Sequence, residues 1–214
     1  MANNIIITGA NQGIGYYMVE KLLAEGNKVS VLDIETDNLT NLKKKYDCLI
    51  FYKVDLRNYD EVKRAVDETV AEFDTIDIAV HNACKCTFES ERKTDLDTYM
   101  DVFDVNYFGA LRLVKCVIPY MSAQKKGRVI FTSSGVGVTG FMNISPYSST
   151  KGALEALAKC LRIEYLIIFL SCCLILHFIL CIHLLQEQNL HHHFLFPKSS
   201  RHYLKKLVTD LQSI

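Results

Sequence analysis

Residues 5–15 have the sequence Ile5-Ile6-Ile7-Thr8-Gly9-Ala10-Asn11-Gln12-Gly13-Ile14-Gly15, an apolar run followed by a glycine-rich turn. Three consecutive isoleucines predict a strand buried on both faces, because β-branched side chains pack well on a pleated surface. In the turn, Gly9 permits a tight reversal, Gly13 lets a phosphate approach the backbone, and Gly15 lets the next helix pack close to the strand. The N-terminus of that helix offers unpaired N–H groups and a partial positive charge. We therefore expect a dinucleotide pyrophosphate to bind at this turn.

The spacing of the glycines is Gly-x-x-x-Gly-x-Gly, not the Gly-x-Gly-x-x-Gly of the long-chain dehydrogenases. By itself this loop also fits an ordinary strand-to-helix turn. Asp33 supports the nucleotide interpretation, because it follows the apolar run at 28–32, where a carboxylate accepts hydrogen bonds from the ribose hydroxyls of adenosine. A carboxylate at this place repels a 2′-phosphate, so the sequence favours NAD over NADP.

The length and the charge balance limit the classes of function. A chain of 214 residues fits one α/β domain with a sizeable core. Lysine plus arginine and aspartate plus glutamate number 24 each, so no general electrostatic attraction to nucleic acid or to an anionic membrane is expected. The sequence therefore does not predict a nucleic-acid-binding protein.

Cysteines and histidines give no metal site. The eight cysteines show no Cys-x-x-Cys spacing and the N-terminus shows no secretory signal, which predicts reduced thiols in a cytoplasmic protein. Three adjacent histidines at 191–193 cannot all face one ion from a regular element, so a solvated polar stretch is expected there.

The hydrophobic pattern then alternates between strands and helices. After the opening strand we predict helices at 13–25, 37–46, 58–73, 96–121 and 146–165, and strands at 28–33, 48–54, 77–81 and 127–132. This alternation predicts parallel βαβ units with right-handed crossovers, and so an α/β fold with a doubly wound, Rossmann-like parallel sheet.

Asp55 follows the third predicted strand and therefore lies at the carboxyl edge of the sheet, which is the ligand side of an open α/β fold. It is a candidate nucleotide contact. An alternative, compatible with the first, is that Asp55 caps the helix that begins near Asn58.

Tyr147 and Lys151 lie four residues apart on the last predicted helix, so they share one face about one turn from each other. An ammonium beside a phenol stabilises the phenolate and lowers its pKa from about 10 toward the working range of a general acid or base. Ser134, at the end of the preceding strand, is placed to donate a hydrogen bond to a substrate carbonyl oxygen. Taken alone, the Tyr/Lys pair also fits a solvated helix face.

Five motifs occur together in a characteristic order: residues 8–15, Asn82-Ala83, Asn106 within Val-Asn-Tyr-Phe-Gly, Ser134, and Tyr147-Ser-Ser-Thr-Lys151. As a set they resemble the classical short-chain dehydrogenases/reductases, over residues 3–165. The resemblance implies an NAD(P)-dependent oxidoreductase that moves a hydride between nicotinamide and the carbonyl or alcohol carbon of a small molecule.

The resemblance also implies a role for each matching residue. Tyr147 would transfer the proton, Lys151 would lower the pKa of Tyr147 and hold the nicotinamide ribose, Ser134 would orient the substrate carbonyl, and Asn106 would order a water in the proton relay. The residues implied for cofactor binding, with Asp33 at the adenosine ribose and Asp55 at the adenine, are Thr8, Gly9, Asn11, Gln12, Gly13, Ile14, Gly15, Asp33, Asp55, Leu56, Asn82, Ala83, Tyr147 and Lys151.

The segment after the fourth predicted strand departs from the family pattern. The family has Asn-Asn-Ala-Gly where this chain has His81-Asn82-Ala83-Cys84. Asn82 and Ala83 keep their backbone role, whereas Cys84 places a side chain where glycine is usual.

A larger departure begins at residue 166. The family continues with a sixth strand, a Pro-Gly turn, a segment over the substrate and a seventh strand, but residues 166–185 here are twenty residues without a formal charge. A helix of that length spans about 30 Å, which matches the core of a bilayer. The sequence leaves three alternatives: a membrane anchor with the catalytic domain facing the cytosol, a buried helix or strand at the sheet edge, or a C-terminus from a frameshift or a retained intron.

We therefore expect a Rossmann-like domain at 1–165 whose sheet lacks its last strands, an apolar helix at 166–185, and a polar tail at 186–214 with a short amphipathic helix. The family commonly forms oligomers, and the apolar character of 96–121 agrees with a homo-oligomer. A second hypothesis is a catalytically silent dinucleotide-binding or membrane-tethered protein with an incomplete substrate pocket.

Overall fold

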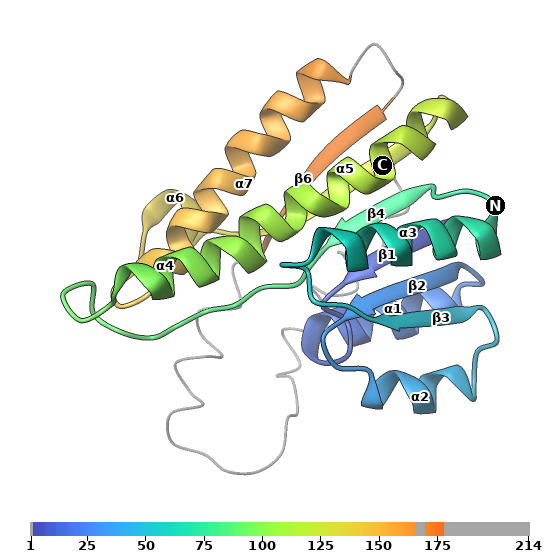
Figure 1. Ribbon diagram of the computed structural model, residues 1–214, viewed down its shortest axis with the longest axis horizontal. Helices are drawn as coiled ribbons and strands as arrows, with labels where there is room; N and C mark the ends of the chain where they lie inside the picture. The colour runs from blue at the N-terminus through green and yellow to red at the C-terminus, as the bar shows by residue number, and fades with distance from the viewer. Residues whose placement is uncertain (1, 166–169, 178–214) are drawn as a thin grey trace.

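The computed structural model describes residues 2–165 and 170–177. Its centre is a parallel sheet in the order β3-β2-β1-β4-β5-β6 (Figure 1). The strands are β1 (Asn4–Thr8), β2 (Lys28–Asp33), β3 (Leu49–Lys53), β4 (Ile78–His81), β5 (Gly127–Ser134) and β6 (Leu170–His177). The prediction of a doubly wound parallel sheet is confirmed.

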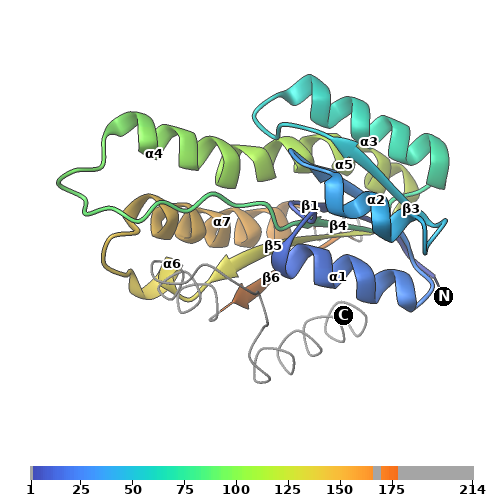
Figure 2. The ribbon, with the colours of Figure 1, turned by 90° about the horizontal axis from the view of Figure 1, so that it is seen from below.

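The helices alternate with the strands along the chain. They are α1 (Gly13–Ala24), α2 (Asp37–Lys43), α3 (Tyr59–Phe73), α4 (Leu96–Phe103), η1 (Asp104–Phe108), α5 (Gly109–Gln124), α6 (Val136–Thr139) and α7 (Ser145–Glu164). Figure 2 shows α3 and α5 on one side of the sheet and α1 on the opposite side.

The run of three isoleucines in β1 is buried on both faces of the sheet, as predicted. Ile6 packs in the core beneath α3, α5 and α7, whereas Ile5 and Ile7 pack in a second core beneath α1 and α2. Successive side chains of a strand point to opposite faces, so this short run anchors both helical layers.

β1 lies between β2 and β4, so the strand order reverses beside it. In open α/β sheets the ligand crevice lies outside the carboxyl ends of the strands at such a reversal. The loop that follows Thr8 and the segment that follows His81 both begin at this place, which positions the candidate site.

Two local predictions need correction. The helix predicted over 96–121 is interrupted by η1, a five-residue π-helix that contains Asn106. Single π-helical turns widen a helix locally and often occur at functional sites. In addition, Asn58 and not Asp55 caps α3, because its side-chain oxygen accepts hydrogen bonds from the backbone N–H groups of Asp60 and Glu61.

The prediction of an apolar helix at 166–185 is wrong for residues 170–177, which form β6. β6 pairs in parallel with β5 along its whole length, from Gly127 with Leu170 to Ser134 with His177. The sheet therefore has a sixth strand where the sequence predicted that its last strands are missing. An apolar run fits a buried parallel strand as well as a helix, and the unpaired edge of β5 decides between the two.

In the described ranges, 2–165 and 170–177, no helix combines the length and the apolar character needed to cross a bilayer. The rest of the predicted apolar segment, 166–169 and 178–185, and the predicted polar tail at 186–214 lie outside the described residues.

Candidate active site

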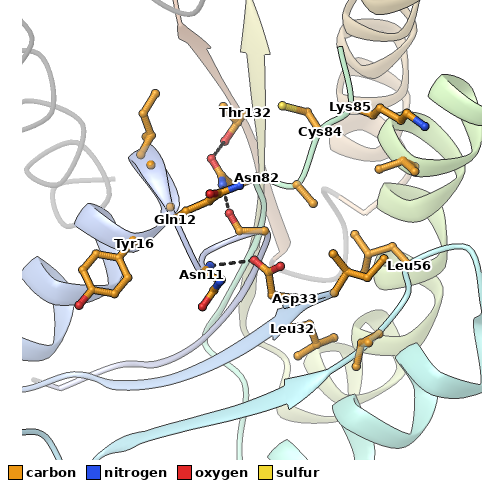
Figure 3. A pocket seen from close by; sticks show the side chains of 18 of the residues that line it. Asn11, Gln12, Tyr16, Leu32, Asp33, Leu56, Asn82, Cys84, Lys85 and Thr132 are labelled. Atoms are coloured by element: carbon orange, nitrogen blue, oxygen red, sulfur yellow. Dashed lines mark hydrogen bonds between the residues drawn. The ribbon is translucent and has the colours of Figure 1, made fainter. Parts of the chain in front are cut away.

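A cavity of about 1040 Å³ opens at the carboxyl edge of the sheet (Figure 3). The residues predicted from the sequence that line it are Gly9, Asn11, Gln12, Gly13, Ile14, Gly15, Asp33, Asp55, Leu56, Asn82, Ala83, Tyr147 and Lys151. Thr8, Asn106 and Ser134 are buried and are not among the lining residues of the described chain. The structure thus brings most predicted cofactor residues and the Tyr/Lys pair to one cavity.

Two glycines of the first loop meet severe steric limits. Gly9 has a φ of +66°, and a Cβ there would lie 2.3 Å from the Cα of Ala83. A Cβ on Gly15 would lie 2.3 Å from the carbonyl oxygen of Gly9. Both positions therefore need glycine for packing, and the segment after β4 lies directly against the loop.

Gly13 differs from these two glycines. Its φ is +60°, yet a Cβ there would have no atom within 4 Å. The conformation is left-handed and the space beside it is open toward the cavity, which fits the close approach of a phosphate group.

Asp33 joins the glycine-rich loop to the end of β2. Its Oδ2 accepts a hydrogen bond of 2.7 Å from the backbone N–H of Asn11 (Figure 3). Its Oδ1 accepts one of 3.1 Å from the N–H of Glu35. Asn38 donates to both the side-chain and the backbone oxygen of Asn11. Sequence reasoning missed Asn38, which also lines the cavity.

Asp55 forms an ion pair with Arg57, a residue that was not predicted from the sequence as part of the site. Arg57 donates to both carboxylate oxygens of Asp55, at distances from 2.7 to 3.0 Å, and this hydrogen bonding lowers the pKa of Asp55. Arg57 also pairs with Asp101 on α4, which in turn pairs with Lys85. The spacing of Asp55 and Arg57, at the end of a strand, was the available signal for this contact.

A buried network connects the end of β1 to η1. The hydroxyl of Thr8 accepts hydrogen bonds of 3.2 Å from the backbone N–H groups of Asn82 and Ala83. It lies 3.1 Å from Nδ1 of His81, and Nε2 of His81 lies 3.0 Å from the backbone oxygen of Asn106. Both lone pairs of the Thr8 hydroxyl oxygen accept hydrogen bonds, so its O–H donates to Nδ1 of His81. The ring proton of His81 is therefore on Nε2, which donates to the backbone oxygen of Asn106.

His81 is therefore a neutral imidazole with its proton on Nε2. Burial lowers its pKa from 6.5 to about 3, and the nearby Lys151 ammonium acts in the same direction. The sequence showed only that histidine replaces the usual asparagine at this place. The ring links Thr8 at the end of β1 to Asn106 in η1, and this contact depends on the packing of β1, β4 and η1.

The side chain of Asn106 clamps the segment after β4 to α7. Its Oδ1 accepts a hydrogen bond of 2.6 Å from the N–H of Lys85, and its Nδ2 donates to the carbonyl oxygen of Lys85 at 2.9 Å. Nδ2 also donates to Oγ1 of Thr150, whose hydroxyl donates to the backbone oxygen of Tyr147. The structure places Asn106 as a support for the Tyr/Lys helix.

Tyr147 and Lys151 are both 1% exposed. Nζ of Lys151 lies 5.3 Å from the centre of the Tyr147 ring and donates a hydrogen bond of 2.7 Å to the carbonyl oxygen of Thr132. Burial lowers the pKa of Lys151. Ser134 is buried at the end of β5, where its Oγ accepts a long hydrogen bond of 3.5 Å from the N–H of Val136.

The strand order, with a glycine-rich loop where it reverses, is that of the Rossmann-like dinucleotide-binding folds. The family model described as short chain dehydrogenase matches residues 3–168. The chain therefore belongs to the short-chain dehydrogenase family, a family of oxidoreductases, and the resemblance seen in the sequence is confirmed.

Known relatives and solved structures match about four fifths of the chain. An uncharacterized oxidoreductase of Staphylococcus saprophyticus is 31% identical over 166 residues, which are 77% of this chain and 68% of that protein. The crystal structure of a short-chain dehydrogenase from Streptomyces avermitilis is 27% identical with a TM-score of 0.78, covering 81% of this chain and 65% of that one. An NAD⁺-bound xylitol dehydrogenase structure is 27% identical with a TM-score of 0.74, covering 78% and 67%.

The depressed pKa of His81 makes a prediction about stability. His81 binds a proton near pH 6.5 in the unfolded chain but only near pH 3 in the folded chain. The free energy of unfolding therefore decreases as the pH falls from about 6.5 to about 3. We expect the unfolding free energy to fall more steeply in the native protein than in His81→Asn, by up to about 1.4 kcal/mol per pH unit. Urea unfolding followed by circular dichroism at a series of pH values measures this difference.

All other titratable residues are the same in both proteins, so the comparison isolates the effect of residue 81. Parallel stability profiles from pH 7 to about 4 would show that His81 is not buried as a neutral ring.

Proposed function

We propose that this chain is an NAD-preferring oxidoreductase that transfers a hydride between nicotinamide and the carbonyl or alcohol carbon of a small-molecule substrate. The observation that carries the proposal is that Tyr147 and Lys151 line the same cavity as the glycine-rich loop. A group able to transfer a proton thus lies where a dinucleotide fits, and reduction of a carbonyl needs both a hydride and a proton.

The lining residues fit a dinucleotide in three respects. Gly13 leaves open space beside a left-handed backbone, the first turn of α1 offers its N–H groups, and Asp33 carries a carboxylate at the end of β2. The volume of about 1040 Å³ is at the upper end of ordinary ligand pockets, which range to about 1,000 Å³. When bound, the dinucleotide supplies or accepts the hydride.

Tyr147 is the proposed acid/base. The ammonium of Lys151 lies near its ring and is fixed by the carbonyl of Thr132, so its positive charge is placed to stabilise a phenolate when Tyr147 gives up its proton. Ser134 is proposed to orient the substrate carbonyl from the end of β5. Asn106 holds the helix that carries Tyr147 through Thr150, which makes it a positioning residue in this proposal.

The preference for NAD rests on the charges around the adenosine side of the cavity. Asp33 lines the cavity with its carboxylate, which repels a 2′-phosphate. The cationic side chains among the described lining residues are Arg57, Lys85 and Lys151. Arg57 and Lys85 are each paired with a carboxylate, so neither offers an unneutralised charge to a 2′-phosphate.

Self-association is part of the proposal. Leu96 and Met100, four residues apart on α4, are 77% and 61% exposed. Phe108, the last residue of η1, is 46% exposed. Large apolar side chains that share an exposed face favour burial against another chain. We propose that α4 and η1 contribute to a homo-oligomer interface.

Replacement of Tyr147 by phenylalanine removes the hydroxyl that transfers the proton. In Tyr147→Phe we expect turnover to fall by about 10²- to 10⁴-fold while NADH still binds. NADH absorbance, followed with a panel of carbonyl and alcohol substrates, measures the rate. Tyr120→Phe is the matched control, because the Tyr120 hydroxyl donates to Asp67 outside the cavity.

Unchanged turnover in Tyr147→Phe would contradict the assigned role. If the native protein binds NADH but reduces no substrate of the panel, the chain is the catalytically silent dinucleotide-binding protein of the second hypothesis.

Asp33 determines the choice of cofactor in this proposal. In Asp33→Asn the negative charge is lost, so the ratio of NADPH to NADH affinity should rise at least about tenfold, which corresponds to about 1.4 kcal/mol. Isothermal titration calorimetry with each cofactor measures the ratio. Asp74→Asn is the control, because Asp74 ends α3 away from the cavity, and an equal ratio in Asp33→Asn would refute the proposed preference.

A charge on the exposed face of α4 should prevent self-association. We expect Met100→Glu to have a smaller mass in light scattering than the native protein, because an oligomer would bury the carboxylate. Val138→Glu, at a position 71% exposed on α6, is the control and should keep the native mass. A native protein that is monomeric at every concentration tested would show that α4 makes no such interface.

A further inference from the structure

Cys84 places a thiol in the candidate cofactor cavity. It is exposed, it lines the cavity, and it follows the two residues that contact the glycine-rich loop (Figure 3). Ala83, directly before it, lies so close to the loop that a Cβ on Gly9 would be 2.3 Å from its Cα. A group attached to Cys84 would therefore stand in the space on which a bound dinucleotide depends.

The backbone on both sides of Cys84 is fixed. The N–H of Ala83 donates to the hydroxyl of Thr8, and Asn106 bonds both the N–H and the carbonyl of Lys85. Because the residues before and after it are held by buried partners, the thiol cannot be withdrawn from the cavity by a small movement of this segment.

Cys84 is the more accessible of the two cysteines among the described residues that line the cavity. Lys151 lines the same cavity with a buried ammonium, and this ammonium interacts electrostatically with the sulfur atoms of both Cys84 and Cys86. The thiolate is the nucleophile in thiol chemistry. Cys86 is only half-exposed, and its Sγ lies 4.0 Å from the carbonyl oxygen of Thr87, so Cys84 is the more accessible of the two.

We propose that Cys84 is a site of reversible covalent modification by small disulfides, and that the attached group competes with the dinucleotide for the cavity. The proposal rests on the dinucleotide site of the proposed function. It gives this chain a thiol-sensitive control of cofactor binding at the position where the family pattern has glycine, which has no side chain to modify.

The chemistry is a thiol–disulfide exchange. The Cys84 thiolate attacks one sulfur of a disulfide such as glutathione disulfide, a new S–S bond forms, and the old S–S bond breaks. The other half of the disulfide leaves as a thiolate and takes up a proton from water. Cys84 is oxidised, the released thiol is the reduced product, and an added dithiol reverses the step.

The experiment begins with the full chain in its reduced form. Direct NADH binding to the unmodified protein is measured first by fluorescence. The protein is then treated with glutathione disulfide, with and without saturating NADH, and the modified cysteines are quantified by mass spectrometry of the digest. Cys160 is the internal control, because it is exposed on α7 and is not among the described residues that line the cavity.

We expect glutathione on both Cys84 and Cys160 without NADH, and at least a tenfold reduction at Cys84 alone when NADH is bound. The protein modified at Cys84 should lose NADH binding and recover it with dithiothreitol. Modification of Cys84 that NADH does not reduce, in a protein that binds NADH, overturns this inference alone. A reduced, unmodified protein that binds no NADH overturns the proposed function as well.

Two variants separate Cys84 from the other thiols. For each variant the measured quantity is the ratio of NADH binding after glutathione disulfide treatment to binding before it. We expect this ratio to fall below about one tenth in the native protein and in Cys160→Ser, and to stay near one in Cys84→Ser. A low ratio in Cys84→Ser would show that another cysteine is responsible and would overturn the assignment.

Discussion

The hydroxyl of Thr8 accepts hydrogen bonds from the N–H groups of Asn82 and Ala83 and donates one to His81, whose second nitrogen donates to the carbonyl of Asn106. All of these bonds are buried or partly buried, where an unpaired donor or acceptor costs about 1–3 kcal/mol. The loop after β1, the segment after β4 and η1 are thereby held in one arrangement. The cavity exists because these parts cannot move independently.

The same network extends to the candidate catalytic helix. Asn106 bonds Lys85 on one side and Thr150 on the other, and Thr150 bonds the backbone of Tyr147. Lys151 is buried with its ammonium on the carbonyl of Thr132, at the end of β5. A buried charge is tolerated only with such a partner, so β5 fixes the cation that the proposed acid/base needs.

Part of the site could be predicted from the sequence because its signals are local. The glycine-rich loop, Asp33 at a strand end, and Tyr147 with Lys151 depend on spacings within one element, and the structure brings them to one cavity. Arg57, which binds the Asp55 carboxylate, and His81, which joins Thr8 to Asn106, were missed as functional contacts. Thr8 and Asn106, the partners of His81, are distant from it in the sequence, so no local spacing indicates that role. Arg57 is only two residues from Asp55, and this spacing was the available signal for their contact.

The sequence by itself determined the parallel α/β fold, since apolar strand segments alternate with helical segments along the chain and such an alternation forms parallel βαβ units. It also determined the family, because the motifs occur as an ordered set. Only the tertiary structure decided that residues 170–177 are a strand, because an apolar run takes its form from the edge of β5 on which it pairs. Only the tertiary structure showed that Cys84 lies in the cavity and that the proton of the His81 ring is on Nε2. Burial and hydrogen-bond partners depend on how the elements pack, which no local pattern of residues specifies.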